Sequence, residues 1–254
     1  MIGKNIEGVF VSALSGRKKE SYKIFDDIAK TYDFLNHFLS FGIDIYWRNQ
    51  MLKHLPIKDS INALDLATGT GDVAITLSKV PAIKKITGLD LSQGMIAEGL
   101  KKIKKRKLED KINLMIGDGT NIEASDHCFD LVTISFGIRN FSDPQKSLHD
   151  IFRVLKKDGR LLIMEFSLPK NALIRSLYFF YFRKILPFIG NLLSNHRDAY
   201  TYLNQSVEDF PYGEAFLQLM RNAGFKNLKA YPQTFGIATL YVGDKISSDK
   251  NETP

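Results

Sequence analysis

The chain has 254 residues, of which 44% are hydrophobic and 25% are charged, and its formal net charge is +7. This size and composition are ordinary for a soluble globular protein, and the chain is well above the length at which a hydrophobic core becomes too small for stable folding. A single cysteine, Cys128, excludes an internal disulfide and a zinc cluster, which favours a reducing, cytoplasmic location. The positive charge is compatible with nucleic acid or an anionic membrane surface, and alone it does not choose between them.

The ends of the chain differ from its middle. Residues 1–20 lack a signal-peptide pattern, and like residues 244–254 they are polar, so both are expected to be flexible. Residues 21–243 are expected to form a single domain. Within it, apolar residues recur at helical spacing over residues 21–55, which predicts a helical cap ahead of the first strand.

Strand-like and helix-like segments alternate after the cap. We predict strands at 62–67, 84–90, 112–117, 130–136 and 160–166, with helices at 71–80, 92–107 and 144–156. This alternation predicts a doubly wound parallel sheet, whose ligand lies beyond the carboxyl ends of the strands. A helix at about 212–223 and a terminal hairpin, 225–231 with 236–242, complete a mostly parallel sheet of seven strands.

A glycine turn follows the first predicted strand, in the segment ALDLATGTGD of residues 63–72, and Asp90 ends the second strand nineteen residues after Gly71. This arrangement is typical of a Rossmann-like sheet that holds an adenosine-containing cofactor. Gly69 and Gly71 let the backbone approach the ligand closely, and Asp90 accepts hydrogen bonds from ribose hydroxyls.

Two further carboxylates distinguish between cofactors. The turn satisfies the relaxed dinucleotide pattern G-x-G-x-x-A, which alone is a weak signal for a nicotinamide dehydrogenase. Asp65 lies within the first strand and Asp72 at the turn, and with Asp90 they would repel a pyrophosphate. They suit the positive sulfonium and ammonium groups of S-adenosylmethionine, which indicates a class I methyltransferase. The alternative is that Asp65 only caps the turn and Asp72 the next helix.

Polar residues also follow the third and fourth predicted strands. Asp118 can accept from an adenine amino group, beside the backbone of Gly119, although Asp118 could simply start a turn. Ser135 ends the fourth strand, where a methyl donor would present its sulfur. Arg139 and Asn140 then place a cation and an amide at the mouth of the site, where a base methyltransferase would carry a polar-Pro-Pro-aromatic signature. Arg139 could instead pair with a nearby acid and clamp the loop.

Residues 171–193 are strongly apolar and aromatic, but their uncharged run is too short for a bilayer span. We predict a helical insertion at 171–210, which either packs on the sheet, covers a hydrophobic substrate as a lid, or rests on lipid headgroups. The basic run 101–107 has no interleaved aromatic residues, so it favours a solvated helix face over a nucleic-acid platform, and an electrostatic contribution to membrane docking stays open. The histidines are isolated, and no metal site is predicted.

Three segments resemble the menaquinone/ubiquinone biosynthesis C-methyltransferase family. They are YDFLNHFLSFGIDIYW at residues 32–47, ISFGIRN at 134–140 and RVLKKDGRLLIMEFS at 153–167. The similarity extends over about residues 20–243, and two long signatures in the right order are far more specific than the glycine turn.

The resemblance implies methyl transfer from S-adenosylmethionine to a ring carbon of a prenylated quinol. We expect demethylmenaquinol as the acceptor. The alternatives are the 2-polyprenyl-6-methoxy-1,4-benzoquinol of ubiquinone biosynthesis and another lipophilic acceptor. Carried over by position, the cofactor contacts are Thr70, Asp90, Asp118 with Gly119, and Ser135.

The reaction assigns roles to further residues. Arg139 is expected to stabilise a phenolate, Asn140 to orient the ring oxygen, and Asp72, Asp33 or His37 to accept a proton. A peripheral contact with the inner face of the membrane and an oligomer are both compatible with the sequence.

Overall fold

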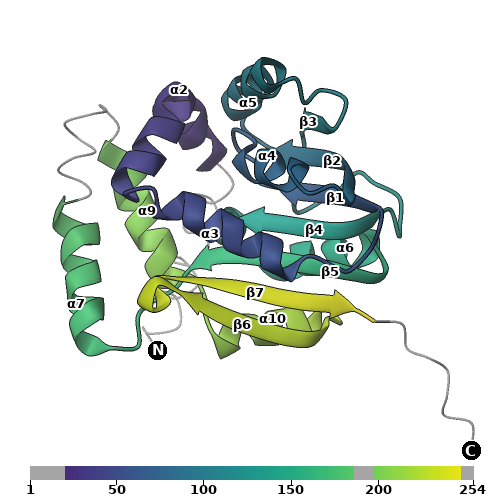
Figure 1. Ribbon diagram of the computed structural model, residues 1–254. Coiled ribbons are helices and arrows are strands. Elements are labelled where there is room, and N and C mark those ends of the chain that lie inside the picture. Colours follow the sequence, from purple (N-terminus) through teal and green to yellow (C-terminus); the bar gives the residue numbers. More distant parts are fainter. Residues whose placement is uncertain (1–20, 186–196, 247–254) are drawn as a thin grey trace, which may run out of the picture.

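The computed structural model describes residues 21–185 and 197–246 (Figure 1). It begins with a helical cap made of α2 (Ser21–Leu39), α3 (Ile43–Met51) and the short turn η1 (Leu52–His54). Gly42 separates α2 from α3 with a φ of +75°, a left-handed conformation that glycine adopts without the steric cost of a Cβ. These helices match the cap predicted at residues 21–55, whereas residues 1–20 and 247–254 lie outside the described part of the chain.

The sheet has seven strands in the order β3-β2-β1-β4-β5-β7-β6, and β1 to β5 are parallel. The strands are β1 (Ile61–Leu66), β2 (Ile83–Asp90), β3 (Ile112–Ile116), β4 (Phe129–Ser135), β5 (Leu155–Phe166), β6 (Lys226–Gln233) and β7 (Ala238–Lys245). Strand β7 lies between β5 and β6 and is antiparallel to both. The order reverses at β1 and β4, so the ligand crevice is expected where these two strands end.

Side chains of each strand point alternately to two apolar layers. In β1, Ala63 belongs to the layer formed with α3, α4 (Asp72–Ser78) and α5 (Gln93–Arg106), and Leu64 belongs to the layer formed with α6 (Pro144–Val154) and α10 (Glu214–Asn222). Both residues are at most 1% exposed. Because both faces of the sheet are covered at its centre, β1 and β4 are nearly continuous buried runs and lack strict polar alternation.

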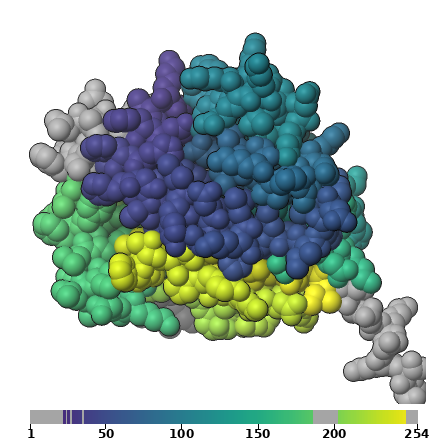
Figure 2. Space-filling view, in the orientation of Figure 1, coloured from purple at the N-terminus to yellow at the C-terminus, as the bar shows by residue number. Residues whose placement is uncertain are grey.

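The helical insertion follows β5 and packs against the cap. It contains α7 (Ala172–Phe180), the π-helical turn η3 (Tyr181–Ile185) and α9 (Arg197–Asp209). Asn171 caps α7, because its side chain accepts hydrogen bonds from the backbone N–H groups of Leu173 and Ile174. Figure 2 shows α7, in green, against the purple cap, and the Tyr181 hydroxyl donates to the Leu39 carbonyl at 2.6 Å. No helix among the described residues is long and apolar enough to cross a membrane.

Two predicted boundaries are wrong. Strand β5 begins at Leu155, not at residue 160. The prediction missed this start because residues near it, among them Asp158, are polar and exposed and give no apolar signal. Strand β7 begins at Ala238 and continues to Lys245, whereas the predicted strand covers 236–242. The Lys245 ammonium is buried and donates to the carbonyl oxygens of Phe152 and Leu155, which ties this strand end to the neighbouring elements.

Candidate functional site

A first pocket lies at the carboxyl ends of β1, β2 and β4, where the glycine turn predicted a cofactor. Gly69 and Gly71 have φ values of +55° and +81°, so the turn uses conformations that disfavour other residues. The Asp90 carboxylate accepts hydrogen bonds from the backbone N–H groups of Gly69 and Ser92, at 2.8 and 2.9 Å. Burial raises the pKa of Asp90, and these hydrogen bonds oppose that rise.

The residues present in this pocket fit S-adenosylmethionine. Asp90 lines the pocket and retains lone pairs for a ribose diol, since a carboxylate offers about four acceptor sites. The Ser135 hydroxyl is buried and has no hydrogen-bond partner in the part of the chain that the structure describes. Gly119 and Phe141 both line the pocket, and a Cβ on Gly119 would lie 2.5 Å from the Phe141 ring. Any larger residue at position 119 would therefore force the Phe141 ring to move. An unsatisfied buried hydroxyl calls for a partner that a bound ligand can supply.

Asp65 supports the turn from beneath and does not line the pocket. It is 1% exposed, and its two carboxylate oxygens accept from the hydroxyls of Thr68 and Thr133, each at 2.6 Å. Burial raises its pKa to about 6, against the lowering effect of these two hydrogen bonds. Asp65 therefore caps the turn, which is the alternative that the sequence left open.

Thr70 and Asp72 point away from the pocket toward the cap. The Thr70 hydroxyl donates to Asp33 at 2.5 Å, and the Lys102 ammonium binds Thr70, Asp33 and Asp72 together. Asp72 also lies 3.5 Å from the Arg48 guanidinium. This polar cluster joins α2 and α3 to α4 and α5, so its members have a structural function that the glycine motif did not reveal.

Two other predicted cofactor residues lie beside the pocket. A Cβ on Gly71 would be 3.3 Å from the Leu114 side chain, on the side of the turn that faces the apolar layer. The Asp118 carboxylate accepts from the backbone N–H of Thr120 at 2.8 Å and shapes the turn after β3. A direct cofactor contact from either residue stays a prediction.

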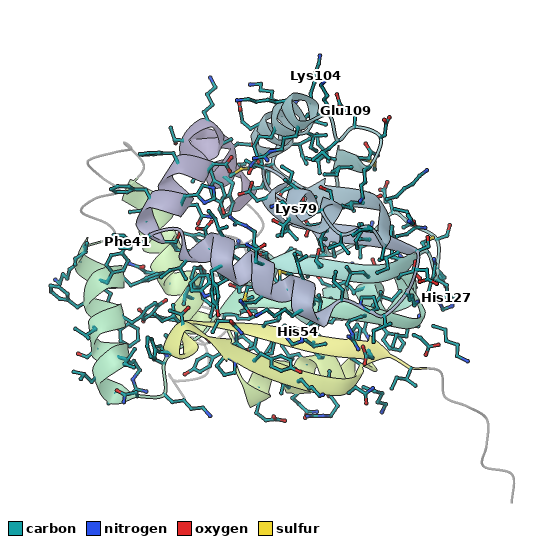
Figure 3. All side chains as sticks on the ribbon, viewed as in Figure 1. Phe41, His54, Lys79, Lys104, Glu109 and His127 are labelled. Atoms are coloured by element: carbon teal, nitrogen blue, oxygen red, sulfur yellow. The ribbon has the colours of Figure 1, made fainter. Side chains whose placement is uncertain are left out.

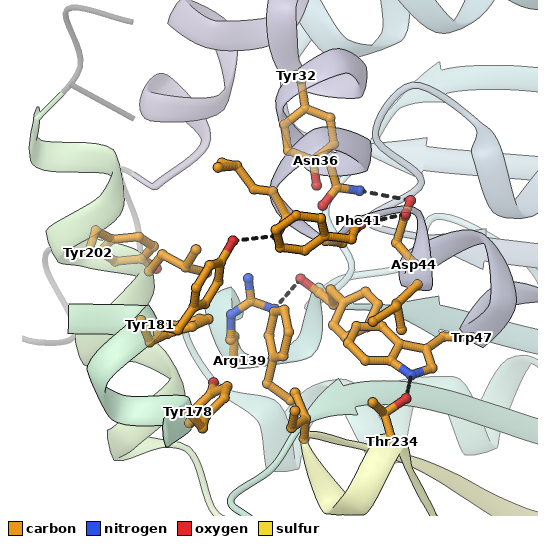
Figure 4. A pocket seen from close by; sticks show the side chains of 18 of the residues that line it. Tyr32, Asn36, Phe41, Asp44, Trp47, Arg139, Tyr178, Tyr181, Tyr202 and Thr234 are labelled. Carbon is orange, nitrogen blue, oxygen red and sulfur yellow. Dashed lines mark hydrogen bonds between the residues drawn. The ribbon is translucent and has the colours of Figure 1, made fainter. Parts of the chain in front are cut away.

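A second cavity, of about 310 Å³, lies between the cap, the insertion and the end of the sheet (Figure 4). Its walls are mostly aromatic and apolar. Representative wall residues are Phe25, Leu39, Phe41, Trp47, Phe136, Phe166, Tyr178, Tyr181 and Phe182. The Trp47 indole is fixed by a 2.8 Å hydrogen bond to the Thr234 hydroxyl. The cavity therefore suits a flat, hydrophobic molecule better than a charged one.

The two cavities adjoin at η2 (Ile138–Asn140). Arg139 lines the apolar cavity, whereas Asn140 lines the cofactor pocket and accepts a hydrogen bond from Tyr202. Tyr32 and Phe136 line both cavities. A molecule in one cavity is thus in reach of a molecule in the other, as transfer of a small group requires.

Arg139 is a buried cation with a specific partner. Its Nη1 lies 2.7 Å from the Glu165 carboxylate, and the two side chains are 5% and 0% exposed. Its guanidinium also lies over the Phe166 ring at 5.2 Å from the ring centroid, and its Nε has no hydrogen-bond partner within residues 21–185 and 197–246. The sequence left open that Arg139 pairs with a nearby acid and clamps the loop, and the structure contains such a pair. The acid is Glu165, whose only signal in the sequence was its place in the second family signature.

Asp44 is an acidic residue on the wall of the apolar cavity. It is 2% exposed and binds Ser40, His37 and Arg48, with distances of 2.6 Å to the first two. Burial would raise its pKa, but the hydrogen bonds with Ser40 and His37 and the charge of Arg48 hold the pKa below its usual value. The predicted proton acceptors Asp33, His37 and Asp72 do not line the cavity.

The fold and the first pocket define a class I S-adenosylmethionine-dependent methyltransferase. A solved S-adenosylmethionine-dependent methyltransferase of Thermotoga maritima, described as a possible histamine N-methyltransferase, has the same fold. Its TM-score is 0.61 at 18% identity, over 89% of this chain and 99% of that one.

The model of the ubiE/COQ5 methyltransferase family matches residues 14–245, and the chain belongs to this family. It is 44% identical to the ubiquinone/menaquinone biosynthesis C-methyltransferase UbiE of Geotalea uraniireducens, over 91% of this chain and 99% of that one. It is 42% identical to the demethylmenaquinone methyltransferase of Chlorobaculum tepidum, over 87% and 90% of the two chains.

Proposed function

We propose that the protein methylates a ring carbon of a prenylated quinol, converting demethylmenaquinol to menaquinol. The observation that carries this proposal is the contact between a cofactor pocket and a large aromatic cavity that holds a buried arginine. The names of the relatives support a quinone acceptor, and those called demethylmenaquinone methyltransferase support the naphthoquinol.

Arg139 and the aromatic walls explain how a ring carbon becomes reactive. When bound, S-adenosylmethionine supplies an electrophilic methyl group. A quinol carbon is a poor nucleophile until its neighbouring hydroxyl, with a pKa near ~10 in water, loses its proton, which passes to water at the cavity mouth beside the exposed Phe41. The Arg139 cation, held by Glu165 in a buried ion pair, favours the phenolate. The aromatic walls then hold the ring against the junction of the two cavities. After the methyl group bonds to the ring carbon, S-adenosylhomocysteine leaves, and the hydrogen of that carbon returns as a proton to the ring oxygen, which restores the aromatic quinol.

Asn140 keeps a role in the proposed reaction, whereas Asp72 does not. Asn140 stands at the junction, where its amide can orient a ring oxygen or the cofactor. Asp72 is left out of the chemical step, because Lys102 binds its carboxylate outside both cavities.

Label transfer tests the proposal. The purified protein, S-adenosylmethionine with a labelled methyl group and chemically reduced demethylmenaquinone are mixed, with the ubiquinone benzoquinol precursor in parallel. Label in the naphthoquinol alone supports the proposal, and label in both acceptors extends it to both menaquinone and ubiquinone biosynthesis. Label in the benzoquinol alone, or in neither while S-adenosylhomocysteine binds, overturns it. Arg139→Ala is expected to lose most turnover and to keep its affinity for S-adenosylhomocysteine.

We also propose that the mouth of the aromatic cavity rests on a membrane surface. Large apolar side chains are exposed on α2 and α7, beside the cavity-lining Phe41, which is itself 77% exposed. They are Phe34, Phe38, Leu173, Leu177 and Phe180. Exposed Lys170 and Arg175 flank them, which suits anionic headgroups. Figure 3 places Phe41 beside α7, far from Lys104 on the exposed basic face of α5.

Sedimentation with vesicles tests this docking. Phe38→Ser with Phe180→Ser is expected to reduce binding to vesicles that contain anionic lipid, because exposed aromatic area is lost. Ile57→Ser is the matched control, since Ile57 is fully exposed in the loop before β1. Equal binding of the double variant and the control would contradict the proposal.

A further inference from the structure

Tyr178 of α7 is a buried phenol whose hydroxyl has no hydrogen-bond partner among the described residues. Its side chain lines the aromatic cavity and is 6% exposed, and no described residue pairs with its hydroxyl. In Figure 4 its oxygen points toward the side of the cavity that Arg139 occupies. A buried hydroxyl without a partner costs free energy, so its persistence in a cavity wall needs an explanation.

The surrounding rings fix the position of this hydroxyl. The Tyr178 ring stacks on Phe182, with centroids 4.8 Å apart and planes at 26°, and it contacts Phe179 at 5.8 Å. Tyr178, Tyr181 and Phe182 stand three and four residues apart, on one face of the insertion. The phenol oxygen is therefore held in place by packing and not by a hydrogen bond.

Two neighbouring tyrosines of the cavity wall already have hydrogen-bond partners. Tyr181 donates to the Leu39 carbonyl, and Tyr202 donates to Asn140. Two buried donors on this wall lack partners among the described residues, namely the Tyr178 hydroxyl and the Arg139 Nε. Burial raises the pKa of Tyr178, which favours the protonated hydroxyl, and a protonated hydroxyl can donate a hydrogen bond to a polar ligand.

A quinol ring has two oxygens on opposite carbons, and the rest of the molecule is hydrocarbon. Two separate donors in an aromatic cavity match that distribution of polar atoms. We infer that Tyr178 is a substrate-positioning residue, whose hydroxyl donates a hydrogen bond to the ring oxygen that Arg139 does not bind. This inference rests on the proposed quinol acceptor. It gives the insertion a role in orienting the ring as well as in covering it.

Tyr178→Phe tests the inference, with Tyr241→Phe as the matched control. Tyr241 is a buried phenol of β7 whose oxygen accepts from the Gly213 N–H at 2.7 Å, and it does not line the cavity. Tyr178→Phe is expected to raise the KM for the reduced quinone about threefold to tenfold, the loss of one hydrogen bond, with unchanged affinity for S-adenosylhomocysteine. It is also expected to raise the Tm of the ligand-free protein, whereas Tyr241→Phe lowers the Tm and leaves KM unchanged.

An acceptor analogue that lacks the second ring oxygen separates positioning from packing. If Tyr178 binds that oxygen, wild type and Tyr178→Phe have the same KM for a prenylated naphthol that keeps only the hydroxyl beside the methylated carbon. An unchanged KM for the quinol, or an equal penalty on both acceptors, overturns the inference. Methyl transfer by the wild type to the quinol is measured first, so a failure of the proposed function is recognised separately.

Discussion

Replacing Glu165 with glutamine removes the negative charge from the buried ion pair that holds Arg139. The Glu165 carboxylate also accepts from the backbone N–H of Phe166 at 2.8 Å, so it connects the end of β5 to η2. Glutamine keeps the size and one acceptor oxygen. The change therefore isolates the loss of charge from a change in packing.

The magnitude follows from burial and distance. Both side chains are at most 5% exposed, and their closest atoms are 2.7 Å apart. Unit charges ~4 Å apart attract by ~4 kcal/mol at an effective dielectric constant of ~20. Removing one partner of a buried pair costs about 3–5 kcal/mol, because the other charge is left uncompensated. We expect Glu165→Gln to lose about 3–4 kcal/mol of unfolding free energy.

Urea unfolding measures this loss, and turnover measured alongside should fall, because Arg139 is no longer oriented. Affinity for S-adenosylhomocysteine should change little. The double variant Arg139→Met with Glu165→Met should recover at least half of the lost stability, since no buried charge remains. A loss below about 1 kcal/mol for Glu165→Gln would refute the reasoning, because it would mean that Arg139 does not depend on this carboxylate.

Three further changes test the cofactor pocket and the cap. Ser135→Ala should stabilise the ligand-free protein by up to ~1 kcal/mol and weaken S-adenosylhomocysteine binding about threefold to tenfold in calorimetry; unchanged affinity would contradict the assigned contact. The folded pKa of Asp65, about 6, exceeds its ordinary 3.8, so the folded protein keeps this proton longer and wild-type stability falls as pH rises from about 4 to about 6. The stability of Asp65→Asn relative to wild type should therefore increase across that window by about 3 kcal/mol and stay level above it, as urea unfolding at each pH can show; a pH-independent difference would exclude the shifted pKa. Lys102→Met should cost about 1–3 kcal/mol and accelerate hydrogen exchange in α2, because Asp33 and Asp72 lose their shared cation; unchanged exchange would show that the cap is held elsewhere.

Apolar runs and glycine turns made the fold predictable. The segment before Gly69 reads as a buried strand because β1 is covered on both faces, and the same holds for β4. The start of β5 was missed because exposed polar residues there hide the backbone pairing that continues the strand. A local pattern of apolar residues indicates which residues are buried, whereas the pairing of strands depends on residues that are distant in the sequence.

The candidate site was predictable only in part, for a geometrical reason. Sequence places Asp90, Ser135 and Arg139 at strand ends, where parallel topology brings them together. It places Asp72 equally near the glycine turn, but the first turn of α4 directs that side chain toward Lys102. Tyr178 was missed because an aromatic run does not show which hydroxyl lacks a partner once the chain is packed.

Carbon methylation is the central claim, and the position of the transferred methyl group tests it most directly. The product formed from ¹³C-methyl S-adenosylmethionine and reduced demethylmenaquinone can be examined by NMR. Methylation driven by an Arg139-stabilised phenolate predicts that the label is bonded to the ring carbon beside a hydroxyl. Label on a ring oxygen, or no label in a preparation that binds S-adenosylhomocysteine, would contradict the account.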